Sequence, residues 1–283
     1  TFTTAPANFH VVANEPHLLA EKVAQNLLGV RMQCAQCHNH PFEKWSMDDY
    51  YGFAAFFGQV GRKRGDDPYE WVIWDRRNGD VRNKRNGEIS PPRLLGAGLA
   101  TIPQGTDRRA VLAQWLTAGD NPFFAANVVN RLWARLFGRG IVDPVDDVRV
   151  SNPASHPKLL ADLAKLFVES GFDVRPVVAV ICKSRSYQLG KHGQLGKHGS
   201  APPAALFAAN QVRRLSAEQL LDAIGAVTGV PTKYAGVELG GPATELDGSG
   251  SNVRFLDVFG RPPRTSACTC DRREEPTLGQ TLH

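Results

Sequence analysis

Residues 34–38, with the sequence Cys-Ala-Gln-Cys-His, have the side-chain types and the spacing that attach a haem group covalently. In a C-x-x-C-H pattern the two thiols add to the two vinyl groups of one haem, and the adjacent imidazole ligates the iron. We therefore expect Cys34 and Cys37 to form thioethers and His38 to be the proximal ligand of haem c. Such an iron alternates between its ferrous and ferric states, so the pattern predicts a module associated with electron transfer.

A second axial ligand for this iron must come from elsewhere in the chain. Methionine and histidine are the usual choices. The candidates close in sequence are Met47, Met32, His40, His10 and His17. His40 lies only two residues from His38 and can hardly swing to the opposite face of the ring, so Met47 or another histidine is favoured.

The same thiols also permit a different site. A C-x-x-C pair is half of a zinc site or a redox-active dithiol, and His40 adds a further ligand. Cys268 and Cys270 form a second pair, so the four cysteines could bind one zinc ion or form two disulfides. Pairing within Cys268-Thr269-Cys270 needs a strained ring, and we expect one of these thiols to lie within reach of a thiol elsewhere. In this alternative the protein is a structural or binding component of the cell envelope without haem.

A covalently held haem needs an apolar slot beside its attachment motif. Aromatic and aliphatic side chains flank the motif on both sides: Leu27, Leu28, Trp45, Tyr50, Phe53, Ala54 and Phe57. They either form walls of the slot or are the hydrophobic core of the first domain. Haem binding requires Cys34, Cys37 and His38 to face one open pocket of several hundred cubic ångströms.

The elements that must position this motif follow a helical period through most of the chain. We predict a mainly α fold, made of helical domains with a small β-hairpin insertion between about residues 71 and 90. In that insertion Asn78-Gly79 and Asn86-Gly87 are turn signals. Caps and apolar spacing predict helices over residues 16–28, 48–57, 107–119, 121–137, 156–170 and 174–187 and from Ser216 onward. We expect residues 174–187 to be buried.

Two domains are predicted. Residues 1–95 form the C-terminal part of the domain that carries the C-x-x-C-H motif, and residues 96–283 form a helical companion domain. Within the companion domain the hexapeptide Gln-Leu-Gly-Lys-His-Gly occurs twice in succession. This repeat is rich in glycine and has no apolar face, so residues 188–202 are expected to be a flexible linker.

The composition excludes some classes of protein. The chain of 283 residues is 42% hydrophobic and 22% charged, which is typical of a globular protein, and it contains no apolar run of membrane-spanning length. The net charge of +5 has local basic excesses at residues 62–64 and 76–85, for which a solvated hairpin is favoured over polyanion binding. No nucleic-acid motif is present.

We find no convincing catalytic constellation in the sequence. There is no G-x-S-x-G nucleophile motif, and no nucleophile and base stand in a recognisable pattern. Asp143, Asp146 and Asp147 are the best carboxylate cluster, and we expect them to cap and solvate a loop.

Long segments of the chain resemble a known pair of domains. Residues 27–60, LLGVRMQCAQCHNHPFEKWSMDDYYGFAAFFGQV, are similar to the signature of the domain of unknown function 1549. Residues 121–173, the SRSYQL segment, RRLSAEQLLDAI and residues 255–283 are similar to its usual companion, domain 1553. The resemblance implies a large exported planctomycete protein of the periplasm or cell surface, in which a small cytochrome c-like domain often precedes this pair.

The family brings no proven activity, so the assignment of haem to Cys34, Cys37 and His38 rests on the local motif. The preceding cytochrome domain or another redox protein is the implied partner. The chain begins without Met and shows no signal peptide, so we expect it to be an internal fragment of the exported protein.

Overall fold

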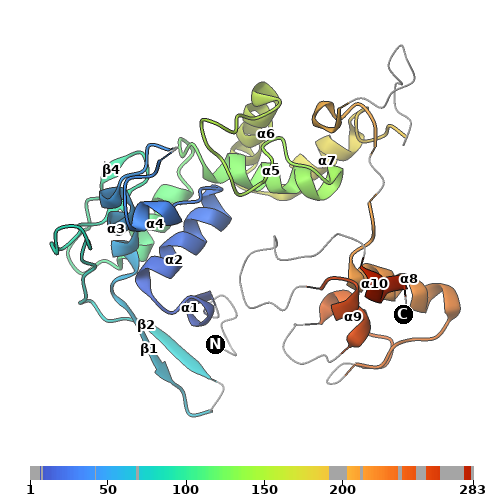
Figure 1. Cartoon of the computed structure of the whole chain (residues 1–283), viewed down its shortest axis with the longest axis horizontal. Coiled ribbons are helices and arrows are strands. Elements are labelled where there is room, and N and C mark those ends of the chain that lie inside the picture. Colours follow the sequence, from blue (N-terminus) through green and yellow to red (C-terminus); the bar gives the residue numbers. More distant parts are fainter. Residues whose placement is uncertain are drawn as a thin grey trace. The chain divides into compact units, whose positions relative to one another are not determined.

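The computed structural model describes residues 7, 9–41, 43–67, 70–190, 203–210, 213–234, 238–246, 253–261 and 277–281. The chain divides into two compact units, Thr1–Gln211 and Val212–His283. Helices dominate the described residues, which contain two small antiparallel sheets of two strands each (Figure 1). The mainly α fold with a small β-hairpin part is confirmed. The predicted boundary near residue 95 stays a prediction.

The first unit begins with the helices that flank the C-x-x-C-H motif. The short α1 (Phe9–Val12) precedes α2 (Pro16–Val23), and α2 continues as a π-helical turn, η2 (Ala24–Leu28). Gly29 ends this helix in the left-handed conformation with φ 72°, which glycine adopts readily because it has no Cβ. The chain then passes through η3 (Gln33–Gln36), a 3-10 turn that carries the motif.

Helix α3 (Met47–Ala54) follows the motif and extends into a 3-10 turn, η4 (Ala55–Phe57). A capping box fixes its start: Asp49 N–H donates to Ser46 Oγ at 3.1 Å, and Ser46 N–H donates to Asp49 Oδ2 at 2.9 Å. This start sets the rotation of α3 and turns its aromatic side chains inward. They pack with α2 and with α4 (Arg108–Leu116) in one core, whose largest fully buried members are Leu19, Leu28, Met32, Tyr50, Phe53 and Phe56.

Strand β2 (Trp71–Asp75) pairs antiparallel with β1 (Val60–Arg64), and β3 (Arg93–Leu94) pairs with β4 (Gly98–Leu99). The strand at Trp71 was predicted, but its partner precedes it instead of following it within residues 71–90. Gly61 explains this pairing, because the ring of Trp74 lies where a side chain at position 61 would be, 2.5 Å from an ideal Cβ. The Asn86-Gly87 turn closes only an isolated bridge between Arg82 and Ile89.

Three further helices of the first unit surround a second core: α5 (Phe124–Phe137), α6 (Pro157–Glu169) and α7 (Val174–Lys183). Trp133 and Phe137 stack there with ring centroids 4.2 Å apart. The expected burial of residues 174–187 is wrong for one side of α7. Val177 and Ile181 are buried, whereas Val180 is 50% exposed, because only one face of α7 packs against its neighbours. A short 3-10 turn, η5 (Ala204–Leu206), lies near the end of this unit.

The second unit contains α8 (Ala217–Thr228), the 3-10 turn η6 (Ala243–Glu245), α9 (Arg254–Val258) and α10 (Leu278–Thr281). Its small core is formed by Ala217, Leu221, Tyr234, Ala243, Leu246 and Leu256. Cys268, Cys270 and residues 191–202 of the predicted linker lie outside the described residues.

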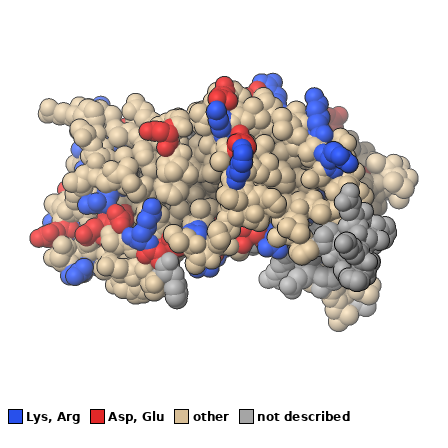
Figure 2. Space-filling view, turned by 90° about the horizontal axis from the view of Figure 1, so that it is seen from above, with Lys and Arg blue, Asp and Glu red and all other residues tan. Residues whose placement is uncertain are grey.

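Charged side chains of both signs lie next to one another on the face of the molecule drawn in Figure 2. On α6, ion pairs one helical turn apart also place opposite charges side by side, Lys158 with Asp162 and Lys165 with Glu169. This face therefore offers no extended surface of one charge that would favour a polyanion.

Candidate functional site

The C-x-x-C-H motif lies on a single 3-10 turn with both thiols directed outward. Cys34 and Cys37 are exposed free cysteines, whereas Ala35 between them is fully buried. Two backbone hydrogen bonds shape the turn, from Ala35 N to Met32 O at 2.9 Å and from Cys37 N to Cys34 O at 3.4 Å. The small side chain of Ala35 thus anchors the turn while the cysteines remain available to a ligand.

A pocket of about 600 Å³ opens beside the motif. Its lining consists of Gln36, Cys37, His38, Asn39, Met47, Lys84 and Arg85. Two residues of the motif and the favoured sixth ligand therefore face the same space, whose volume is in the range of small-molecule and cofactor sites. Cys34 is not part of this lining, so the expectation that Cys34, Cys37 and His38 face one pocket holds for Cys37 and His38 and is wrong for Cys34.

The imidazole of His38 is held in one tautomer. Its Nδ1 lies 2.8 Å from the carbonyl oxygen of Asn39. Because a carbonyl oxygen only accepts hydrogen bonds, this contact requires the proton on Nδ1. The lone pair of Nε2 is then available to a metal, and a carbonyl partner on the other ring nitrogen is the usual arrangement for a ligating histidine.

Met47 is the first residue of α3 and is only 6% exposed. Its backbone N–H donates to Asn39 Oδ1 at 3.2 Å, which ties the start of α3 to the residue that follows the motif. The other sixth-ligand candidates do not line the pocket. Met32 is fully buried in the core, and the lining also excludes His10, His17 and His40.

Two basic side chains, Lys84 and Arg85, complete the pocket from a turn outside the motif. Asn83 fixes this turn, since its Oδ1 accepts from Arg85 N at 2.9 Å and its Nδ2 donates to Asp48 Oδ1 at 2.7 Å. Tyr51 joins the turn to the motif, because its hydroxyl donates to Gln36 O at 2.8 Å. Burial and the nearby Cys37 raise the pKa of Tyr51. A hydrogen bond from the backbone of Lys84 lowers this pKa, but its effect is smaller.

The aromatic walls considered from the sequence do not surround this pocket. Trp45, Tyr50, Phe53, Ala54 and Phe57 are buried in the core of the first unit and are absent from the pocket lining. Tyr50 illustrates the reason, because α3 directs its ring inward and its hydroxyl donates to Glu21 Oε1 at 2.6 Å. Burial and this hydrogen bond raise the pKa of Tyr50. The core interpretation of these aromatics is therefore the correct one.

The zinc alternative gains no ligand cluster from the described part of the chain. No three His, Cys, Asp or Glu side chains within it are grouped so that they could hold a metal ion. The four-cysteine site and the predicted pairing of Cys268 or Cys270 involve residues outside this part and stay predictions.

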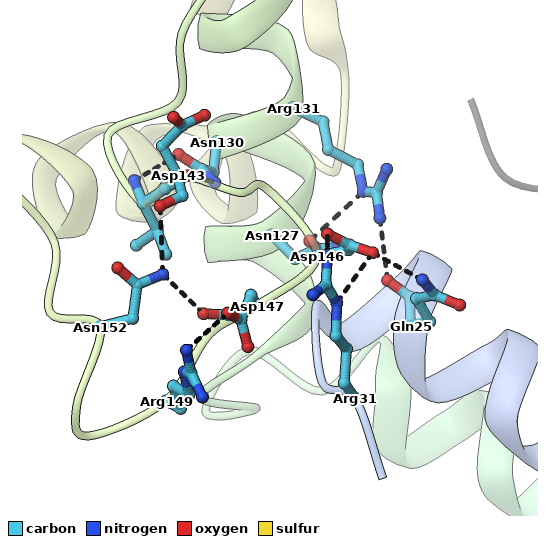
Figure 3. A network of polar contacts seen from close by, with 11 residues as sticks. Gln25, Arg31, Asn127, Asn130, Arg131, Asp143, Asp146, Asp147, Arg149 and Asn152 are labelled. Atoms are coloured by element: carbon cyan, nitrogen blue, oxygen red, sulfur yellow. Dashed lines mark hydrogen bonds and ion pairs between the residues drawn. The ribbon is translucent and has the colours of Figure 1, made fainter. Parts of the chain in front are cut away.

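A second polar site lies at the junction of α2 and α5 (Figure 3). Asp146 is 2% exposed and accepts hydrogen bonds from Arg31 Nη2 at 2.6 Å, Arg31 Nε at 3.2 Å and Gln25 Nε2 at 2.5 Å. Burial alone would raise the pKa of Asp146, but the hydrogen bonds from Arg31 and Gln25 and the charge of Arg31 hold it below its usual value. We refer to Gln25, Arg31, Asn127, Arg131 and Asp146 as the Asp146 network.

This arrangement corrects the expectation that Asp143, Asp146 and Asp147 solvate a loop. Asp147 is also buried and pairs with Arg149 Nη2 at 3.2 Å. Only Asp143 is substantially exposed, and it lies 3.6 Å from Arg139. Asp146 and Asp147 are buried with basic partners that neutralise them, Arg31 from a distant segment for Asp146 and Arg149 from the same loop for Asp147.

Two asparagines of α5 are functional parts of this junction that the sequence interpretation missed. Asn127 Nδ2 donates to Asn26 O at 2.8 Å, and Asn130 makes hydrogen bonds of 2.8 and 2.9 Å with the backbone of Val142. Arg131 Nη2 donates to Gln25 O at 2.8 Å. The available signal was two amides three residues apart in the mostly apolar first half of α5, a spacing that places both on one face.

Comparison with known protein families identifies two matches. Residues 5–62 match the family described as "Protein of unknown function (DUF1549)", and residues 108–248 match "Protein of unknown function (DUF1553)". No curated protein and no solved structure matches the chain. Among the described residues, no helix has both the length and the apolar character that crossing a bilayer requires. The C-x-x-C-H motif and Arg31 lie in the first matched segment, and Asp146 lies in the second.

Proposed function

We propose that this chain, which belongs to the proteins that pair the domains of unknown function 1549 and 1553, binds a c-type haem through Cys34, Cys37 and His38. The observation that carries the proposal is the pocket of about 600 Å³ that Cys37, His38 and Met47 share. A thiol, an imidazole and a thioether are the three groups that haem c attachment and His–Met ligation use.

Part of the pocket lining suits this group, although the apolar walls expected from the sequence are not among the lining residues. The tautomer of His38 leaves Nε2 available to the iron, and Met47, whose thioether is the sixth ligand that we favour, lines the same pocket. Lys84 and Arg85 add two positive charges that suit the propionate groups of a haem. The bound haem would supply one-electron transfer, and the protein would hold it, orient it and restrict the access of water.

The two cysteines are expected to contribute unequally. Only Cys37 lines the pocket, and Cys34 lies outside it on the preceding turn. We expect a Cys34→Ala variant to retain haem through a single thioether in reduced yield, and a Cys37→Ala variant to retain none. This asymmetry distinguishes haem from a structural thiol pair, in which loss of either cysteine has the same consequence.

The setting of this function is part of the proposal. Haem c is normally attached outside the cytoplasm, and the paired domains resemble those of exported surface proteins. We place the protein in the periplasm or at the cell surface, where a preceding cytochrome c-like domain or a separate redox protein exchanges electrons with it.

The experiment is a visible spectrum of the full chain produced with a haem-attachment system. We expect a Soret band that survives denaturation and acid-acetone extraction, and the low-spin spectrum to be lost in His38→Ala. His17→Ala is the control, since His17 is a partly exposed candidate outside the pocket lining, and its spectrum should match that of the unmodified chain. A colourless protein that contains stoichiometric zinc, or one with oxidised Cys34 and Cys37, contradicts the proposal and supports the structural alternative.

A further inference from the structure

The C-x-x-C-H motif lies in a segment with little regular structure of its own. We define the motif loop as residues 30–46, between the end of η2 and the start of α3. Among the described residues of this loop, the one element of secondary structure is the 3-10 turn Gln33–Gln36. A backbone hydrogen bond of 2.8 Å joins His40 N to Trp45 O. A segment of this kind needs contacts from outside to hold one orientation.

Some of these contacts come from α3, where the Tyr51 hydroxyl donates to Gln36 O and Met47 N donates to Asn39 Oδ1. Others come from a distant segment, residues 143–152, which follows α5. On the N-terminal side of the motif, Val148 N donates to Gly29 O at 2.8 Å, and Asp146 receives both hydrogen bonds of Arg31. On the C-terminal side, Val150 N donates to Glu43 Oε1 at 3.1 Å. Three positions of the 143–152 loop thus contact the chain just before and just after the motif.

The 143–152 loop is itself fixed to the helical core. Asn152 Nδ2 donates to Asp147 O at 2.9 Å and to Asp143 O at 3.3 Å, which closes the loop on itself (Figure 3). At its base, the side chain of Asn130 on α5 bonds the N–H and the C=O of Val142. These hydrogen bonds restrict the 143–152 loop, so the position of α5 determines where this loop contacts the motif loop.

We propose that the 143–152 loop is a positioning element for the C-x-x-C-H motif, with Asp146 and Val150 holding the motif loop at its two ends. The segment matched by domain 1553 then forms part of the site of domain 1549, so neither segment holds the motif in its observed orientation alone. The inference rests on the proposed function only for the identity of the ligand, because the positioning itself is a property of the free protein.

The test is hydrogen–deuterium exchange of the full chain without haem, read by peptide mass spectrometry. Glu43→Ala removes the acceptor of Val150 N, whereas Glu43→Gln retains a side-chain oxygen there. Asp146→Asn removes the charge at the other end. We expect exchange of residues 30–46 to rise about tenfold in Glu43→Ala, with α3 and α6 unchanged and with Glu43→Gln close to the unmodified chain. In Asp146→Asn, which also lowers global stability, exchange of residues 30–46 should rise clearly more than that of α3 and α6.

Asp162→Asn is the matched control, since Asp162 forms an exposed ion pair within α6 and should leave every peptide unchanged. Unchanged exchange of residues 30–46 in both Glu43→Ala and Asp146→Asn overturns the inference. A uniform rise over α3, α6 and the motif loop also overturns it, because that pattern reports global destabilisation. In haem-loaded protein, Glu43→Ala and Asp146→Asn should lower the fraction of low-spin haem. If the unmodified chain attaches no haem, the proposed function fails. The exchange result still decides whether the 143–152 loop positions the motif.

Discussion

The motif pocket and the Asp146 network contain polar side chains in opposite environments. Around the pocket, Cys37 and His38 are exposed, and Nδ1 of the imidazole bonds the backbone of Asn39. In the network, Asp146 is buried and its carboxylate receives three hydrogen bonds from two side chains. The polar side chains around the pocket are therefore available to a ligand, whereas those of the Asp146 network bind one another within the protein.

The difference shows why residue type alone is a poor guide to function. A buried carboxylate is tolerated because Arg31 and Gln25 satisfy it, and the result is a fixed junction of α2, α5 and the 143–152 loop. An exposed thiol or imidazole contributes little to stability, so its presence at a pocket is better explained by binding. Substitutions in the two regions should therefore separate ligand binding from stability.

The largest expected effect is on ligand binding, in Cys37→Ala. Because Cys37 is the motif thiol that lines the pocket, this variant should lose covalent haem completely, measured as the Soret absorbance left after acid-acetone extraction. Its free energy of unfolding without haem should change by less than about 0.5 kcal/mol, since the side chain is exposed. Cys182→Ala in α7 is the control and should retain full absorbance. If Cys37→Ala and Cys182→Ala retained equal amounts of haem, Cys37 would have no special role in binding. The proposed difference between the motif pocket and the Asp146 network would then be lost.

The largest expected loss of stability comes from Gly29→Ala. Gly29 has φ 72°, and an added Cβ would lie 2.7 Å from Asn127 Oδ1 and 2.9 Å from Val148 Cγ2. Left-handed strain and this close approach together should reduce the free energy of unfolding by about 3 kcal/mol in urea titrations. Gly171→Ala is the matched control, because Gly171 has φ 67° but nothing within 4 Å of its added Cβ. It should lose only about 1 kcal/mol, and equal losses would show that Gly29 has no special packing role.

Sequence patterns were sufficient for the elements of this fold. The start of α3 follows from Asp48-Asp49 after Ser46, and the ends of η2 and α5 follow from Gly29 and Gly138, because caps depend on residues close in sequence. The outer face of α7 was predicted to be buried, and β2 was predicted to pair with a strand that follows it. Both predictions were wrong. Both depend on which neighbours the chain brings together, and no local pattern encodes this.

The candidate site likewise has residues that were predicted from the sequence and residues that were not. The C-x-x-C-H motif is contiguous, so its residues and the nearby Met47 were found from the sequence alone. Asp146 and Arg31 are 115 residues apart, and the carboxylate was expected to be solvated because its partner could not be seen. Lys84 and Arg85 were noted only as part of a basic segment. Their place beside the motif depends on Asn83, which bonds a carboxylate 35 residues away.

Asp146→Ala should lower the free energy of unfolding by about 2 kcal/mol at pH 7. Breaking a fully buried ion pair costs more, but the side chain of Arg31 is 43% exposed and regains water when its partner is removed. The measurement is the urea midpoint, compared with that of Asp162→Ala. Asp162 is 62% exposed in a surface pair, so its variant should stay within about 0.5 kcal/mol of the unmodified chain. A loss in the control as large as that in Asp146→Ala would show that the burial of Asp146 is unimportant.

The smallest effect is the pH dependence of the same ion pair. Arg31, Gln25 and the nearby positive Arg131 favour the charged form of Asp146, so its pKa in the folded protein lies below its usual value. A carboxyl group with a lowered pKa stabilises the fold fully above the pKa of the unfolded chain, near 4, and this contribution is lost as the pH falls toward the folded value. The difference in unfolding free energy between the unmodified chain and Asp146→Asn should therefore be constant above about pH 5 and shrink as the pH falls to 3. Asp107 also has a lowered pKa, despite its burial, because of Arg109, but it is present in both chains and cancels in the difference. Urea titrations from pH 3 to pH 7 measure this difference, and a constant gap over the whole range would show that Asp146 does not titrate with folding.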